Sequence, residues 1–92
     1  MKIVLPNKTE LEASRAFKSY IFESDETQLS ITFNGVSMET LINEFTIVPV
    51  KSITIVRTGF SDITYNNIEI TNIIENIDDN SSVVTVTFGL KK

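Results

Sequence analysis

Carboxylates are the side chains of this sequence with the clearest potential for chemistry. The run Asp-Asp-Asn-Ser at residues 78–81 offers oxygen atoms that could bind Ca²⁺. A dedicated calcium loop also needs regularly spaced ligands and a distal bidentate Glu, which this run lacks, so a solvated turn is the favoured interpretation. Glu23, Asp25 and Glu26 form a second acidic cluster, which is interpreted most simply as a polar loop between strands. We therefore predict no metal ligand.

Nucleophilic and redox chemistry have even less support. The chain contains no His, Cys or Trp, which removes the imidazole base, the thiol nucleophile and any disulfide. Gly35, Gly59 and Gly89 stand far apart, so no glycine-rich loop can cradle a phosphate. The sequence also has no Gly-x-Ser-x-Gly elbow and no Ser-x-x-Lys pair. We predict no catalytic residue and no cofactor, and an enzyme would require a cleft with perturbed carboxylates.

Two aromatic residues are the candidates for binding a partner. Phe60 follows Gly59 at a predicted turn, and Tyr65 lies on the short strand after it. Rigid aromatic side chains of this kind anchor many protein interfaces. For Phe60 we favour the interpretation that its ring folds back and caps the core, with a partner-binding ring as the alternative. The other phenylalanines are expected in the core: Phe17, Phe22, Phe33, Phe45 and Phe88.

The charge balance disfavours two classes of partner. Eight basic and twelve acidic residues give a net charge of −4. The basic residues are scattered, whereas a nucleic-acid binder needs a basic stripe to neutralise phosphates. The same sign disfavours an anionic membrane surface, and no apolar run approaches the length of a membrane span. An acidic surface suits a basic protein partner, so we expect a protein partner, no nucleic acid and no membrane.

Length and composition predict one small β-rich domain over residues 1–92. A chain of this size buries roughly 60–65% of its unfolded surface, which is enough for one thin core. Ile (13), Thr (11) and Val (8) favour strands over helices. Apolar and polar residues alternate over residues 28–33, 51–57 and 83–90, which predicts half-buried strands. A small sheet of this kind has exposed edge strands, which could pair with a strand of a partner or of a second copy. Alternatively, Lys18, Lys51 or residues 91–92 protect these edges from such pairing.

One short helix is predicted over residues 37–45. Met38, Leu41, Ile42 and Phe45 form a single apolar stripe, with Ser37 as its N-cap. Pro49 limits its extension. Such a short helix must be stabilised by packing its stripe onto a sheet.

The remaining segments are less regular. A turn is predicted at residues 58–61 and a hairpin turn at residues 78–81. Between them we expect further strand over residues 62–66 and 68–74, with a bulge at residues 66–67. Residues 10–22 carry both a capping-box pattern and β-branched or aromatic residues. We favour extended structure for them, with helix as the alternative.

Several short motifs follow one another in a recognisable order. They are Lys-Ile-Val-Leu at residues 2–5, Asn-x-Thr-Glu-Leu-Glu at 7–12, Ile-Thr-Phe at 31–33, Phe-Thr at 45–46, Ser-Ile-Thr-Ile at 52–55, Ile-x-Ile at 68–70 and Val-Thr-Val-Thr-Phe at 84–88. This order resembles small proteins encoded near the tail genes of phages and prophages of Gram-positive bacteria. The resemblance implies a viral structural or accessory protein of bacteriophage and transfers no functional residue.

The sequence thus predicts a β-rich α+β fold of about six short strands in a small, mostly antiparallel sheet or sandwich with one short helix, in the order β-β-β-α-β-β-β. The expected function is non-catalytic protein–protein interaction in a phage tail or virion, with a phage structural protein or a second copy of the chain as partner. The alternative is an anti-defence protein, similar in action to an anti-CRISPR inhibitor, that blocks a host defence protein. A small enzyme is the least favoured class. The expected location is the host bacterial cytoplasm or the virion.

Overall fold

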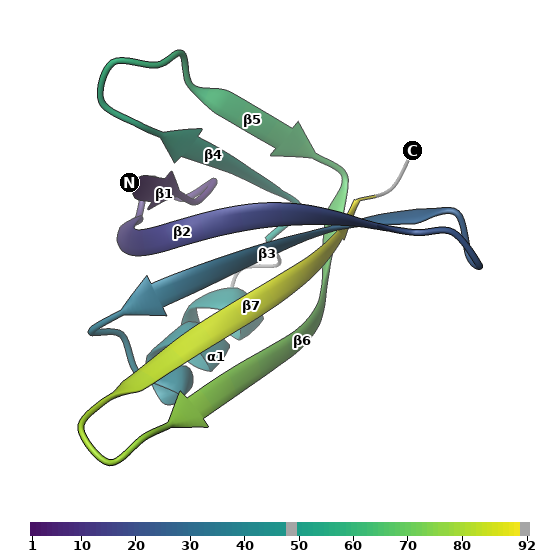
Figure 1. Ribbon diagram of the computed structural model, residues 1–92. Helices are drawn as coiled ribbons and strands as arrows, with labels where there is room; N and C mark the ends of the chain where they lie inside the picture. The colour runs from purple at the N-terminus through teal and green to yellow at the C-terminus, as the bar shows by residue number, and fades with distance from the viewer. Residues whose placement is uncertain (48–49, 91–92) are drawn as a thin grey trace.

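A computed structural model describes residues 1–47 and 50–90 (Figure 1). Its elements are β1 (Lys2–Val4), β2 (Glu10–Ile21), β3 (Glu26–Asn34), α1 (Met38–Ile47), β4 (Ser52–Val56), β5 (Ile63–Asn66), β6 (Ile68–Ile77) and β7 (Ser82–Leu90). The prediction of a β-rich α+β fold with one short helix is confirmed, with three strands before the helix. Four strands follow it, because the strand predicted as bulged at residues 66–67 is divided there into two.

The seven strands form one antiparallel sheet in the order β5-β4-β1-β2-β3-β7-β6. Its two edge strands, β5 and β6, are consecutive in the chain and meet at Asn67, which adopts a left-handed φ of 56°. Ile68 N–H donates to the Lys51 carbonyl across this corner at 3.1 Å. A register shift lies instead within β6, between Ile70 and Asn72. Lys51 precedes β4, an interior strand, so it guards no sheet edge; residues 91–92 lie outside the described residues.

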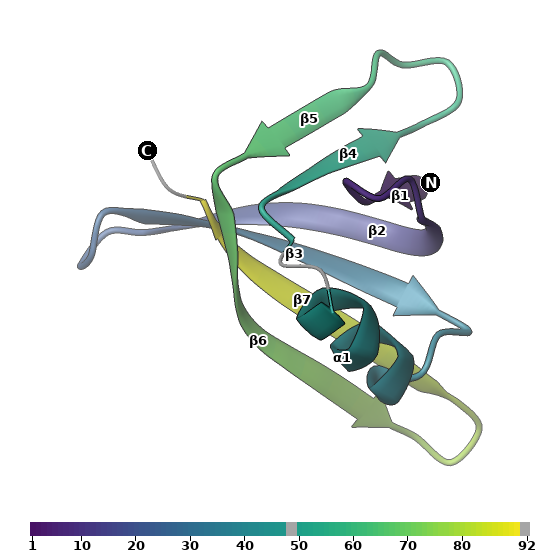
Figure 2. The ribbon, with the colours of Figure 1, turned by 180° about the vertical axis from the view of Figure 1, so that it is seen from behind.

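The sheet is strongly bent, so that its two halves enclose the core. Figure 1 shows β4 and β5 diverging from β7 and β6, and Figure 2 shows α1 lying against β3, β7 and β6 on the inner side. Alternate side chains of the strands point to this side because the side-chain period of a strand is two. The buried apolar residues come from both halves and from the helix: Ile3, Leu5, Ala13, Leu29, Ile31, Phe33, Leu41, Phe45, Val50, Ile53, Ile55, Ile68, Val84, Val86 and Phe88.

Helix α1 confirms most of its predicted pattern. Ser37 is its N-cap, since its Oγ accepts from Thr40 N–H at 3.1 Å. Leu41 is fully buried, and Phe45 makes an edge contact with the Phe88 ring at 6.0 Å between ring centres. Ile42, however, is 44% exposed, so its assignment to the buried stripe is wrong. Leu41 and Phe45 reach the core, whereas Ile42, rotated by about 100° from Leu41 around the helix axis, lies outside it. Pro49 lies outside the described residues.

The ambiguous N-terminal segment is extended, as predicted, and forms strand β2. Strand β1 pairs only with residues 10–12 of β2, whereas β3 pairs with β2 as far as Ile21. The outer part of the β2–β3 hairpin therefore extends beyond the core (Figure 1). The prediction that Phe17 and Phe22 are core residues is wrong, because no second layer covers this part of the hairpin: Phe17 is about half exposed and Phe22 is 88% exposed.

Candidate functional site

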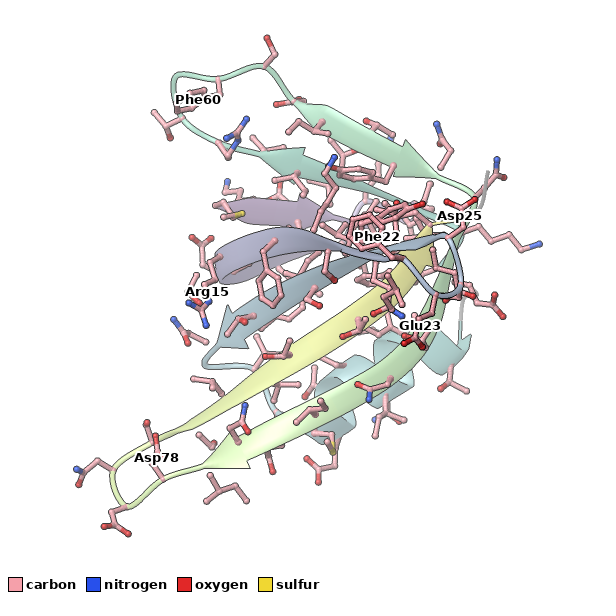
Figure 3. All side chains as sticks on the ribbon, turned by 45° about the vertical axis from the view of Figure 1, so that its right-hand side comes forward. Arg15, Phe22, Glu23, Asp25, Phe60 and Asp78 are labelled. Atoms are coloured by element: carbon pink, nitrogen blue, oxygen red, sulfur yellow. The ribbon has the colours of Figure 1, made fainter. Side chains whose placement is uncertain are left out.

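The end of the β2–β3 hairpin carries the most exposed aromatic side chain among the described residues. Phe22 opens the turn that joins the two strands, and its ring makes an edge contact with Tyr20 at 4.9 Å between ring centres and an interplanar angle of 78°. Figure 3 shows Phe22 with Glu23 and Asp25 at this hairpin. An edge-to-face pair restricts both rings, because it aligns the positive edge of one with the negative face of the other.

Tyr20 and Asp25 link the two strands across the turn. The Tyr20 hydroxyl donates a hydrogen bond to the Asp25 carboxylate, and this bond raises the pKa of the Tyr20 phenol above its usual value. Asp25 adopts a left-handed φ of 52°, a conformation that short polar residues tolerate. The tip is thus an ordered turn that contains Phe22 together with three acidic residues, Glu23, Asp25 and Glu26. The predicted polar loop is confirmed, but it also carries an exposed aromatic ring.

Phe60, the first predicted binding residue, lies at the β4–β5 turn. Phe60 N–H donates to the Arg57 carbonyl at 3.3 Å, which confirms the turn. Its side chain is 65% exposed, so the favoured interpretation, in which the ring caps the core, is wrong. The Arg57 guanidinium lies 4.5 Å from the centre of the Phe60 ring. Figures 1 and 2 show that this turn and the β2–β3 hairpin point in opposite directions, so Phe60 and Phe22 belong to separate surfaces.

Tyr65, the second predicted binding residue, lies on β5 opposite Ile53 of β4 and is half-buried. Lys18 of β2 places its Nζ 5.8 Å from the centre of the Tyr65 ring. The Tyr65 ring also lines a pocket of about 180 Å³ between β2 and the β4–β5 hairpin, and Arg57 lines the same pocket. The fold thus connects the two predicted residues only indirectly, through Arg57.

The acidic turn at residues 78–81 closes the β6–β7 hairpin, as predicted. Asp78 N–H donates to the Ser81 carbonyl at 2.8 Å. Within residues 1–47 and 50–90, no three His, Cys, Asp or Glu side chains are grouped so as to bind a metal ion. None of the helical residues described here forms a span long and apolar enough to cross a membrane.

The hairpin tip is the site that sequence reasoning missed. The available signal was the run Tyr-Ile-Phe directly before six polar residues. A strand that ends in a solvated turn cannot bury the side chains of both its faces there. Comparison with known proteins adds no assignment: no protein-family model and no curated protein matches this chain in sequence.

Proposed function

We propose that this protein is a non-catalytic interaction module of a phage tail or virion, and that it binds its protein partner through the β2–β3 hairpin. The observation that carries the proposal is the Phe22 ring, 88% exposed at the end of an ordered hairpin. Phe22 is the last of three consecutive exposed apolar or aromatic side chains, after Tyr20 and Ile21. An interface uses such a ring as an anchor that fills a pocket on the partner. The phage setting rests on the resemblance of the strand motifs.

The chemistry of the tip defines the partner surface. Residues 22–26 contain three acidic residues and no basic residue. A complementary surface has an apolar pocket for the ring and a rim of Lys or Arg, and charge complementarity speeds association. The Tyr20 contact and the turn fix the ring in advance, so less conformational entropy is lost on binding.

Incorporation into particles tests this proposal. The phage or prophage that encodes the chain is propagated with wild-type protein, Phe22→Ser or Ile77→Ser, and gradient-purified particles are analysed by quantitative mass spectrometry. Ile77 is the matched control, because it is an apolar residue, 75% exposed, at the end of β6. Both variants should keep the wild-type urea midpoint, since exposed substitutions change stability by about 0.5 kcal/mol or less.

We expect wild-type protein and Ile77→Ser in the particles and loss of Phe22→Ser from them. Equal incorporation of both variants would refute the hairpin as the docking element. Detection of the wild-type chain only in infected cytosol would refute the structural role and favour the anti-defence alternative, in which the acidic tip occupies a basic site on a host protein.

A further inference from the structure

The pocket beside Tyr65 is a second site, independent of the hairpin tip. Its volume is about 180 Å³. Its apolar wall is formed by Leu29, Ile55, Ile63 and the rings of Phe17 and Tyr65. Two basic residues, Lys18 and Arg57, complete the lining together with Met1 and Ala16, and no acidic residue lines it. The pocket thus combines an apolar interior with cationic groups, which is the composition of a site for an amphipathic anion.

Neither cation belongs to the ion pairs found in the part of the chain that the structure describes, which join the Met1 ammonium to Glu12 and Lys2 to Glu10. Arg57 also borders a second pocket together with Glu12. Both cations contact aromatic rings, Lys18 that of Tyr65 and Arg57 that of Phe60. Arg57 Nε is buried and has no hydrogen-bond partner. A buried donor without a partner carries a desolvation cost.

The size of the pocket limits the ligand. An apolar cavity of about 150 Å³ accommodates benzene, so a pocket of about 180 Å³ accepts one ring or one branched aliphatic group. We propose that this pocket binds a carboxylate carried on such a compact apolar group. The carboxylate accepts hydrogen bonds from Arg57 and Lys18, and the apolar group packs between Leu29 and Ile55. The planar guanidinium of Arg matches the two oxygens of a carboxylate.

Two sources supply this chemistry, a free aryl or alkyl carboxylic acid and the C-terminal residue of a peptide. The pocket borders the edge of β2, because the consecutive residues Ala16, Phe17 and Lys18 all line it although successive side chains point to opposite faces. In the described residues, β2 from Arg15 to Ile21 pairs with β3 alone. A peptide therefore finds free backbone groups next to the pocket, whereas a free acid uses only the pocket.

Calorimetric titration of the full chain tests the site. The probes are phenylacetate and the peptide Gly-Gly-Phe with a free carboxylate, and their controls are phenylacetamide and Gly-Gly-Phe-amide. We expect at least one acid to bind, and its amide to bind about tenfold more weakly or not at all, because only the acid can form the charge-assisted hydrogen bonds. Binding of the peptide alone assigns the site to a C-terminus, and equal binding of phenylacetate assigns it to free acids.

Variants locate the binding within the molecule. Arg57→Gln and Lys18→Gln should each lower the affinity for the acid by about tenfold or more. Lys51→Gln removes an exposed charge outside the pocket and should leave that affinity unchanged. The proposal would be overturned by any of three results: equal affinity for acid and amide, no binding of either acid at millimolar concentration, or an equal effect of all three substitutions. The comparison of acid with amide uses the unmodified protein and stands even if a variant fails to fold.

Discussion

Neighbouring residues of helix α1 provide a sharp test of how the helix is packed. Leu41 is 0% exposed and belongs to the core, while Ile42 is 44% exposed. Leu41→Ala leaves a closed cavity, so we expect a loss of about 2–5 kcal/mol in the free energy of unfolding. Ile42→Ala leaves no closed cavity and loses about half of a burial energy of roughly 1.5–3 kcal/mol. Because Ala is also the better helix former by a few tenths of a kcal/mol, the net loss should stay below about 1 kcal/mol.

Urea unfolding followed by far-ultraviolet circular dichroism measures both changes. With a slope of about 1.5 kcal/mol/M, the midpoint should fall by roughly 1.3–3.3 M for Leu41→Ala and by less than about 0.7 M for Ile42→Ala. The slopes of the variants should equal that of the wild type, so that the midpoints report stability alone. Equal shifts for the two variants, or a larger shift for Ile42→Ala, would refute the orientation of α1 described here.

Three further outcomes follow from local contacts. Asp25→Asn should lower the pKa of Tyr20 toward its usual value, and titration of tyrosinate absorbance in the near ultraviolet measures this change. Because folding raises this pKa, the stabilising contact is present at neutral pH and is lost as the pH rises through the raised pKa. An unchanged titration curve would contradict the hydrogen bond. Ser37→Ala should cost about 1 kcal/mol in thermal or urea unfolding, whereas no loss would mean that the cap contributes nothing. Asn67→Val should cost about 1 kcal/mol or more, because a β-branched residue resists a positive φ, and Asn67→Gly should be near neutral; the reverse order would disprove a left-handed corner between β5 and β6.

Sequence periodicity predicted the elements best where one face of each element is buried. The alternation over residues 28–33 and 83–90 corresponds to β3 and β7, which supply Phe33 and Phe88 to the core. The Ser37 cap was also predictable, because capping depends on a local side chain and backbone. The outward position of Ile42 could not be predicted from the sequence, because a helical stripe defines the apolar face of a helix but not how much of that face contacts the sheet.

The candidate binding residues show the same division. The turn at Gly59 follows from local sequence. The exposure of Phe60 does not, because whether its ring caps the core depends on which residues the fold places beside the β4–β5 turn. The exposure of Phe22 depends on how far β1 and the rest of the sheet extend along the β2–β3 hairpin, which no local pattern encodes. The joint lining of one pocket by Lys18 and Arg57 depends on bringing β2 against the β4–β5 hairpin across 39 positions of sequence.

The amino-acid sequence by itself determined the strand-rich composition, the capped helix, the turns and the lack of imidazole and thiol groups, because each of these is set by residue type and short-range spacing. Tertiary structure alone decided which apolar residues stay in water and which charges share a pocket. Burial depends on the neighbours that a bent sheet brings together, and those neighbours are distant in the chain.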